Sequence, residues 1–262
     1  MTLLLISGVA MLIYPTIGDY WNSFRASKAI TSYSEQVSEM KEAEYENMLR
    51  EAQKYNQWLK TRDNEYALSE EEKLQYEETL DVSGTGIMGY VEIPSIDCSL
   101  PIYHGTEESV LQIAIGHIEW TSFPIGGAGT HCVISGHRGL KSAKLFTDLD
   151  RMTEGDLFII RTLDEVLTYE VDRISIVLPH QTEELKIEED KDYCTLMTCT
   201  PYGVNTHRLL VRGRRIENID AREIYVTADA IQIDPVLVAP VVAAPILLVL
   251  FVWLMIKYRK KQ

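Results

Sequence analysis

The spacing of hydrophobic and polar positions changes once along this 262-residue chain, near residue 84. Before that point, residues 32–80 are acidic, and their apolar positions recur at steps of three, four or eight. Such steps place side chains on one face of a helix, so the region is predicted to be helical with one apolar stripe. We expect this stripe to pack against the following domain or a neighbouring protein. It consists of Tyr33, Val37, Met40, Met48, Ala52, Tyr55 and Leu59.

Residues 69–72 (SEEE) match a capping box, which predicts that a shorter helix begins there. From residue 84 onward, β-prone runs alternate with glycine-containing turns at residues 84–86, 125–127 and 154–156. This pattern predicts a mainly β fold, a closed and mostly antiparallel β-barrel preceded by helices.

Two uncharged segments flank this region. Residues 235–256 form an uncharged stretch of 22 residues followed by a basic tail, which predicts a transmembrane helix with a cytoplasmic end. Residues 2–18 are also uncharged, and 17 helical residues reach about 25 Å. They lack both a basic start and an A-x-A cleavage site, so we interpret them as an uncleaved anchor. Two anchors place everything between them outside the cell.

The predicted organisation has six parts. They are an N-terminal membrane anchor or signal-anchor at 1–20, an acidic helical region at 21–83, a β-barrel catalytic domain at 84–220, a linker at 221–234, a transmembrane helix at 235–256 and a basic cytoplasmic tail at 257–262.

The chain is strongly acidic. Its formal net charge is −14, and the part without the four basic residues of the tail carries −18. An acidic surface argues against nucleic acid as a partner. A solvated acidic face is the ordinary explanation, and attraction of a lysine-bearing protein surface is the functional one.

Candidate chemistry is concentrated in residues 195–213, where two β-prone stretches flank a turn with proline and glycine. Cys199 and Arg208 can face each other across this hairpin-like pair. A guanidinium beside a thiol favours the thiolate and offers donors to an oxyanion on an attacked carbonyl. His137 follows another β-prone run, at a glycine-flanked strand end, and supplies a base. Together the three indicate acyl transfer through a thioester.

Each of these residue types also has an ordinary structural use. A lone cysteine is more often a core residue than a nucleophile, and a strand arginine usually lies at the surface. A zinc site is another alternative, although the spacing of its candidate ligands matches no standard pattern. Those candidates are His131, Cys132, Cys194 and Cys199. Cys194 and Cys199 are five residues apart on one predicted strand, so we expect them on opposite faces. Cys98, Cys132 and Cys194 are interpreted as packing residues.

Several motifs resemble one known family, the class C sortases, which are pilin polymerases. Residues 195–213 (TLMTCTPYGVNTHRLLVRG) resemble the family's nucleophile signature. Residues 89–94 (GYVEIP) and 100–105 (LPIYHG) resemble its early barrel strands. Residues 135–140 (SGHRGL) and 143–149 (AKLFTDL) resemble its histidine region. The chain is therefore similar to this family over most of the segment between the predicted anchors.

The resemblance implies a closed eight-stranded sortase-type β-barrel with N-terminal helices and flanking transmembrane helices. It also implies that His137, Cys199 and Arg208 form the catalytic triad. As the base, His137 is preferred over three other histidines, His104, His131 and His207.

The implied reaction is transpeptidation on surface proteins that carry an LPxTG-like sorting signal. The Cys199 thiolate attacks the Thr–Gly carbonyl, His137 transfers protons, and Arg208 holds the substrate and stabilises the oxyanion. A pilin lysine then resolves the thioester as an isopeptide bond. The implied partners are such proteins, a lysine-bearing pilin and the cell membrane, and neither metal nor cofactor is expected.

Three other functions remain open at this point. A sortase that attaches proteins to the cell wall would use the same triad with a peptidoglycan amine. A membrane-tethered thiol protease would release a hydrolysed product. A zinc-stabilised or adhesive surface module would have no activity. The chain also departs from the family, because pilin polymerases often carry an Asp-Pro-aromatic lid motif before the barrel. Here residues 63–66 (DNEY) are a weak substitute at best, so the family's lid is not carried over to this chain. An open cleft would make Cys199 more readily labelled.

Overall fold

A computed structural model describes residues 2–62, 66–218 and 257 of the chain. The chain divides into one compact unit over Met1–Ile219 and a second over Asp220–Gln262. The described fold is that of the first unit. The predicted linker at 221–234, the predicted transmembrane helix at 235–256 and all but Lys257 of the predicted tail lie outside the described residues.

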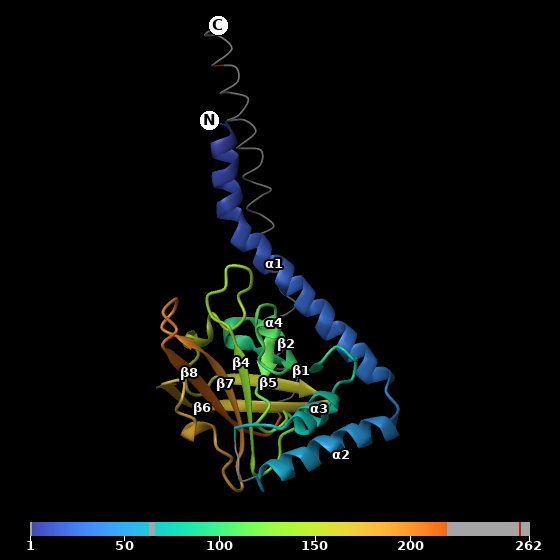
Figure 1. Cartoon of the computed structure of the whole chain (residues 1–262). Coiled ribbons are helices and arrows are strands. Elements are labelled where there is room, and N and C mark those ends of the chain that lie inside the picture. The colour runs from blue at the N-terminus through green and yellow to red at the C-terminus, as the bar shows by residue number, and fades with distance from the viewer. Residues whose placement is uncertain (1, 63–65, 219–256, 258–262) are drawn as a thin grey trace. The chain divides into compact units, whose positions relative to one another are not determined.

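Eight strands form a closed barrel in the first unit (Figure 1). They are β1 (Ile87–Ile93), β2 (Cys98–His104), β3 (Ile115–His117), β4 (Thr130–Gly136), β5 (Leu157–Thr162), β6 (Glu165–Val177), β7 (Asp192–Thr200) and β8 (His207–Arg215). Their order around the ring is β1-β2-β3-β4-β7-β8-β6-β5, and β5 pairs with β1 to close it. The pairs β2–β3 and β4–β7 are parallel, whereas the other six pairs are antiparallel. The predicted mainly β fold with a closed, mostly antiparallel eight-stranded barrel is confirmed.

Helices precede the barrel and interrupt it. The α-helices are α1 (Thr2–Glu39), α2 (Glu42–Leu59), α3 (Glu70–Glu78) and the short α4 (Glu108–Leu111). Three single turns of 3₁₀-helix also occur, η1 (Pro94–Ile96), η2 (Leu149–Arg151) and η3 (Glu183–Leu185). The predicted capping box is confirmed, because the Ser69 hydroxyl accepts a hydrogen bond from the backbone N–H of Glu72 while the Glu72 carboxylate accepts one from that of Ser69. Both bonds satisfy donors that the first turn of α3 would otherwise leave unpaired.

The single apolar stripe predicted between residues 32 and 80 is wrong in one respect, because it is divided between two helices. Lys41 has an extended backbone (φ −76°, ψ 143°) and separates α1 from α2. Tyr33 is buried on α1, whereas Ala52 and Tyr55 are buried on α2. The chain therefore turns between the two halves of the stripe, and each half packs separately.

α1 runs without interruption past residue 20, where the sequence analysis placed the end of a membrane anchor. Pro15 lies inside this helix. Within residues 2–62, 66–218 and 257, no helix combines the length and the apolar character needed to cross a membrane.

Buried polar side chains join the first two helices to the barrel. The hydroxyl of Tyr33 on α1 donates to the backbone oxygen of Met88 at 3.0 Å and accepts from the backbone nitrogen of Leu163 at 2.7 Å. On α2, the Asn56 amide oxygen accepts from the backbone nitrogen of Phe123 at 2.7 Å, and its nitrogen donates to the backbone oxygen of the same residue at 3.3 Å. The hydrogen bonds offset the cost of burying these polar groups, so the groups can hold the helices to the barrel.

Tyr76 makes the equivalent connection for α3. Its hydroxyl accepts from the backbone nitrogen of Gly105 at 2.9 Å and lies 3.0 Å from Nδ1 of His117. Its ring stacks on Phe123 with centroids 5.3 Å apart, and the ring of Tyr55 contacts the same phenylalanine with centroids 4.7 Å apart. The helices and the barrel thus share one aromatic core.

Candidate active site

The three predicted catalytic residues lie at the same end of three neighbouring strands. In the antiparallel β7–β8 pair, the Cα atom of Cys199 is paired with that of Arg208. In the parallel β4–β7 pair, Ser135 is paired with Met197, so the same register continued by two residues brings His137 beside Cys199. Cys199 therefore occupies the middle strand, with His137 on one side and Arg208 on the other.

Gly136 holds the end of β4 close to its neighbours. A Cβ atom at this position would lie 2.6 Å from the ring of Phe146 and 2.7 Å from the side chain of Ile115, so no larger residue fits without movement. The hydroxyl of Thr198 donates to the backbone oxygen of Gly136 at 2.7 Å. The backbone oxygen of His137 accepts from the backbone nitrogen of Phe146 at 3.2 Å. The backbone is thus fixed on both sides of the His137 side chain.

Side-chain alternation places the candidate site on the outer face of the barrel. Cys194 and Leu196 belong to the main core, whereas Met197 packs in a second apolar cluster. Cys199 has the same parity as Met197, so the prediction that Cys194 and Cys199 face opposite sides is confirmed. The second cluster comprises Ile118, Val133, Leu185 and Leu210, together with Trp120, Val177 and Met197. We call it the outer apolar cluster, and it borders the candidate site on the same three strands.

Arg208 is held through one of its nitrogens. Its Nη1 atom donates to the backbone oxygen of His207 at 3.1 Å and lies 3.4 Å from that of Asn205. Within the described residues, its Nε and Nη2 atoms have no hydrogen-bond acceptor. The Arg208 guanidinium can therefore present two further donor atoms, Nε and Nη2, to an anionic oxygen.

Glu108 joins the candidate site, although the sequence analysis did not single it out. Its Oε2 atom lies 3.5 Å from Nε2 of His137. A hydrogen bond from Gln112, and then the neighbouring His137 side chain, keep the pKa of the Glu108 carboxyl below its usual range. Glu108 and His137 are far apart in the chain, so only the pairing of β3 with β4 could have revealed the contact.

The other histidines are engaged elsewhere. Both ring nitrogens of His104 face backbone oxygens, at 2.7 and 3.0 Å, and burial lowers the pKa of His104. The ring of His131 lies between the backbone oxygen of Lys186 at 2.9 Å and the hydroxyl of Thr195 at 2.7 Å. Burial lowers the pKa of His131 to about 4, so this ring is neutral at pH 7. His207 has the opposite parity to Arg208 on β8 and therefore projects to the other face.

The cysteines other than Cys199 pack in or against the core. Cys132 and Cys194 are paired in the β4–β7 register and are buried, and Cys98 packs against the same core. His131 has the opposite parity to Cys132, so the four candidate zinc ligands are split between two faces. Throughout the part of the chain that the structure describes, no three or more histidine, cysteine or acidic side chains are grouped so as to hold a metal ion.

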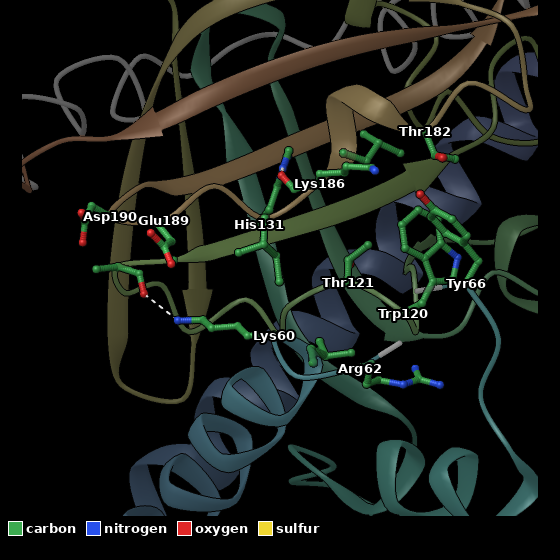
Figure 2. Close-up of a pocket in the computed structure, with 15 residues that line it drawn as sticks. Lys60, Arg62, Tyr66, Trp120, Thr121, His131, Thr182, Lys186, Glu189 and Asp190 are labelled. Carbon is green, nitrogen blue, oxygen red and sulfur yellow. Dashed lines mark hydrogen bonds between the residues drawn. The ribbon is translucent and has the colours of Figure 1, made fainter. Parts of the chain in front are cut away.

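A separate cavity of about 630 Å³ lies further along the barrel (Figure 2). Lys60 and Arg62, which follow α2, approach it on one side, and the β6–β7 connection borders it on another. Tyr66 packs edge-on against Trp120, with ring centroids 5.1 Å apart. His131 also lines the cavity and precedes His137 by six residues, which is about 20 Å along a strand. The cavity is thus distinct from the candidate catalytic residues.

Comparisons with known proteins point to one family. The sortase domain family model matches residues 91–216, a stretch that contains His137, Cys199 and Arg208. Two curated relatives are similar at 28% identity, sortase D of Bacillus subtilis (strain 168) over 131 residues and sortase A of Streptococcus agalactiae serotype III (strain NEM316) over 130 residues. These matches cover 49% and 48% of this chain. The chain spans 63% and 52% of the lengths of these relatives.

Solved structures are similar to a larger part of this chain. Sortase C1 of S. agalactiae is 48% identical with a TM-score of 0.71, and the match covers 73% of this chain and all of that one. Sortase C of Streptococcus pneumoniae is 44% identical with a TM-score of 0.66, covering 73% of this chain and 97% of that one. Sortase C of Clostridium perfringens, solved with the C-terminal cell wall sorting motif, is 42% identical with a TM-score of 0.66, covering 74% of this chain and 100% of that one. The chain therefore belongs to the sortase family of cysteine transpeptidases, and its structural neighbours are class C sortases.

Proposed function

We propose that this chain is a membrane-anchored transpeptidase that cleaves an LPxTG-like sorting signal and joins the cleaved end to a lysine amine of a pilin. The observation that carries the proposal is the placement of Cys199 between His137 and Arg208 at one end of three strands. A nucleophile, a proton-transfer group and a cationic oxyanion-binding group in one row are what a thioester route requires.

In the first step, the Cys199 thiolate bonds to the carbonyl carbon of the signal's threonine, and Arg208 stabilises the oxyanion that forms. The Thr–Gly amide bond then breaks, and protonated His137 gives its proton to the departing amine. In the second step, a neutral lysine amine attacks the thioester and His137 takes its proton. The thiolate leaves, so the enzyme returns to its starting state with an isopeptide bond formed.

The structurally similar proteins support the proposed substrates. One similar solved structure is the sortase C1 of a pilus island, and the S. pneumoniae sortase C structure gives insight into pilin substrate specificity. A sorting motif is present in the C. perfringens structure. In this chain, the outer apolar cluster borders Cys199 on the same face and suits the leucine and proline of such a motif.

Two enzymatic alternatives use the same triad. A cell-wall-anchoring sortase would transfer the acyl group to a peptidoglycan amine, and a tethered thiol protease would transfer it to water. The class C neighbours favour a pilin lysine over both. Membership of an enzyme family argues against a purely structural, metal-stabilised surface module.

The proposed localisation is the cell membrane with the catalytic domain outside. Residues 84–220 form the catalytic domain in this proposal, residues 21–83 the helical region, residues 1–20 and 235–256 the anchors, residues 221–234 a linker and residues 257–262 a cytoplasmic tail. Exposed aromatic side chains on α1 support an interfacial position, because such rings favour the membrane–water boundary. They are Tyr14, Tyr20 and Trp21.

The test uses the full chain in detergent with an LPxTG-type peptide and a lysine-bearing pilin domain. Mass spectrometry should detect a thioacyl adduct on Cys199 and a peptide–lysine isopeptide product. An adduct followed only by hydrolysis, even when the pilin domain is present, would contradict pilin polymerisation. Transfer to a peptidoglycan amine in preference to the pilin would support the wall-anchoring alternative.

A further inference from the structure

Glu108 bridges its own helical turn and the candidate catalytic histidine. Gln112 lies four residues later, which places the two side chains on one face of the turn. The side-chain nitrogen of Gln112 donates to Oε1 of Glu108. The other carboxylate oxygen, Oε2, lies 3.5 Å from Nε2 of His137. Gln112 therefore fixes one oxygen of the carboxylate while the other faces the imidazole.

The pairing of β3 with its neighbouring strands fixes where Glu108 lies relative to His137. Ile115 follows the α4 turn closely and is paired with Gly136, the residue immediately before His137. On its other side, β3 is pressed against β2, since a Cβ atom at Gly116 would lie 1.9 Å from the backbone oxygen of Gly105. The turn that carries Glu108 therefore has little freedom to shift relative to His137.

Charge around the imidazole is unevenly distributed. Glu108 from α4 lies against the ring of His137, and Cys199 from β7 is the neighbour across the strand pair. Arg208 lies one strand beyond Cys199, and Arg138, next in the chain, is paired with Asp150. Among the described residues, Glu108 is thus the carboxylate that contacts the ring.

We propose that Glu108, oriented by Gln112, is a positioning residue that holds His137 through Nε2. This inference rests on the proposed function, in which protonated His137 gives its proton to the departing amine. With Nε2 facing Glu108, the Nδ1 atom exchanges protons with the leaving and incoming amines. A carboxylate that orients the base in this way follows the logic of catalytic triads.

The expected size of the effect follows from exposure. The Glu108 side chain is 72% exposed and the His137 side chain 26%, so water and salt screen the pair. Loss of the carboxylate should lower kcat/KM about two- to fivefold at low salt. The loss should shrink at high salt, because salt screens a charged pair at the surface. A purely structural role of Glu108 would not make the loss depend on salt.

The experiment measures kcat/KM for an LPxTG-type peptide at fixed pH, with the full chain in detergent. Four variants are compared with the wild type: Glu108→Gln, Glu108→Asp, Gln112→Ala and the control Glu107→Gln. Glu107 is the exposed preceding residue and has the same charge as Glu108. Each kcat/KM is measured at about 20 mM and about 500 mM salt, where the Debye length is about 20 Å and about 4 Å.

We expect Glu108→Gln to lower kcat/KM at low salt and to approach the wild type at high salt. Gln112→Ala should cause a smaller loss, Glu108→Asp should partly preserve the wild-type value, and Glu107→Gln should match it. A wild-type kcat/KM of Glu108→Gln at low salt, or an equal loss in Glu107→Gln, would overturn the proposal. Mass spectrometry of the wild type distinguishes failure of the role proposed for Glu108 from failure of the proposed function. A thioacyl adduct on Cys199 together with an insensitive Glu108→Gln overturns the role of Glu108 alone, whereas no adduct overturns the proposed function with it.

Discussion

Arg208 stands directly opposite Cys199 in the β7–β8 ladder, and its Nη1 atom lies 3.1 Å from the backbone oxygen of His207. Anchoring one nitrogen restricts the planar guanidinium while its other donors stay available for an oxyanion. An ammonium cannot do both, because it is a single charged point at the end of a flexible chain. Both the geometry and the charge of Arg208 are therefore expected to matter.

Arg208→Lys should lower kcat for peptide cleavage about 10²-fold or more, in line with the loss of an oxyanion donor. The melting temperature should change little, since Arg208 is at the end of its strand. Arg214→Lys is the matched control, because Arg214 is on the same strand and pairs with Glu170 at an exposed position. Near-normal turnover of Arg208→Lys would assign Arg208 a structural role.

Cys199→Ala should affect activity but not stability, and Cys194→Ala should affect stability but not activity. Cys199 is half-buried at the strand end, so Cys199→Ala should abolish thioacyl formation and leave the free energy of unfolding nearly unchanged. Cys194 is fully buried, so Cys194→Ala should retain activity and lower the free energy of unfolding by about 1–2 kcal/mol through a small core cavity. Denaturant unfolding and mass spectrometry on the same samples check both. Activity in Cys199→Ala would show that the nucleophile is another residue.

Native thiol labelling should be selective. The chain lacks the Asp-Pro-aromatic lid motif, so iodoacetamide is expected to modify Cys199 well before Cys132 and Cys194, which lie in the core. Peptide mapping after short exposures gives the order of modification. Protection of Cys199 equal to that of the core cysteines would mean that the cleft is covered despite the missing motif.

Removal of the Tyr33 hydroxyl should loosen α1. Tyr33→Phe leaves the buried backbone nitrogen of Leu163 without its partner, which should cost about 1–3 kcal/mol in the free energy of unfolding. Tyr20 is 47% exposed on the same helix, so Tyr20→Phe serves as the control and should be neutral. Equal stability of the two variants in urea would show that the Tyr33 hydroxyl does not contribute to the docking of α1.

His131 should make the protein sensitive to acid. Its folded pKa of about 4 lies below the ordinary value of 6.5, so the unfolded chain binds the additional proton between these values. The contribution of His131 to stability is therefore complete above about pH 6.5 and falls by on the order of 3 kcal/mol as the pH drops to about 4. Urea unfolding at several pH values gives the free energy of unfolding as a function of pH. This free energy should depend less steeply on pH in His131→Gln, whereas His180→Gln, at an exposed position, should retain the wild-type dependence.

Features that depend on residues close together in the chain could be predicted from the sequence. Cys199 and Arg208 flank a short turn, so strand alternation alone placed them opposite each other. The glycine-flanked strand end indicated His137, and the resemblance to class C sortases favoured it over the other histidines. The strand ladder adds the alignment of His137 with Cys199, which depends on β4 and β7 being neighbours. Parallel neighbours are set by how the whole sheet closes, so no short pattern in either strand reveals them.

Other features escaped prediction for related reasons. The break at Lys41 has neither proline nor glycine to mark it, so the helical spacing continued through it unnoticed. Glu108 is one of many acidic residues in an acidic chain, and only the pairing of Ile115 with Gly136 brings it to His137. The cavity at His131 draws its walls from α2, the barrel and the β6–β7 connection, which meet only in the folded protein.

The parallel pairing of β4 with β7 also has a consequence for biogenesis. The two strands are separated by the 55 residues between Gly136 and Asp192, which include the whole β5–β6 hairpin. Pairing over such a long separation carries a high loop-closure cost and belongs to the late stages of folding. His137 and Cys199 thus come together only after almost the entire barrel has been synthesised. A nascent chain is consequently inert toward neighbouring proteins, and reactivity begins with completion of the barrel.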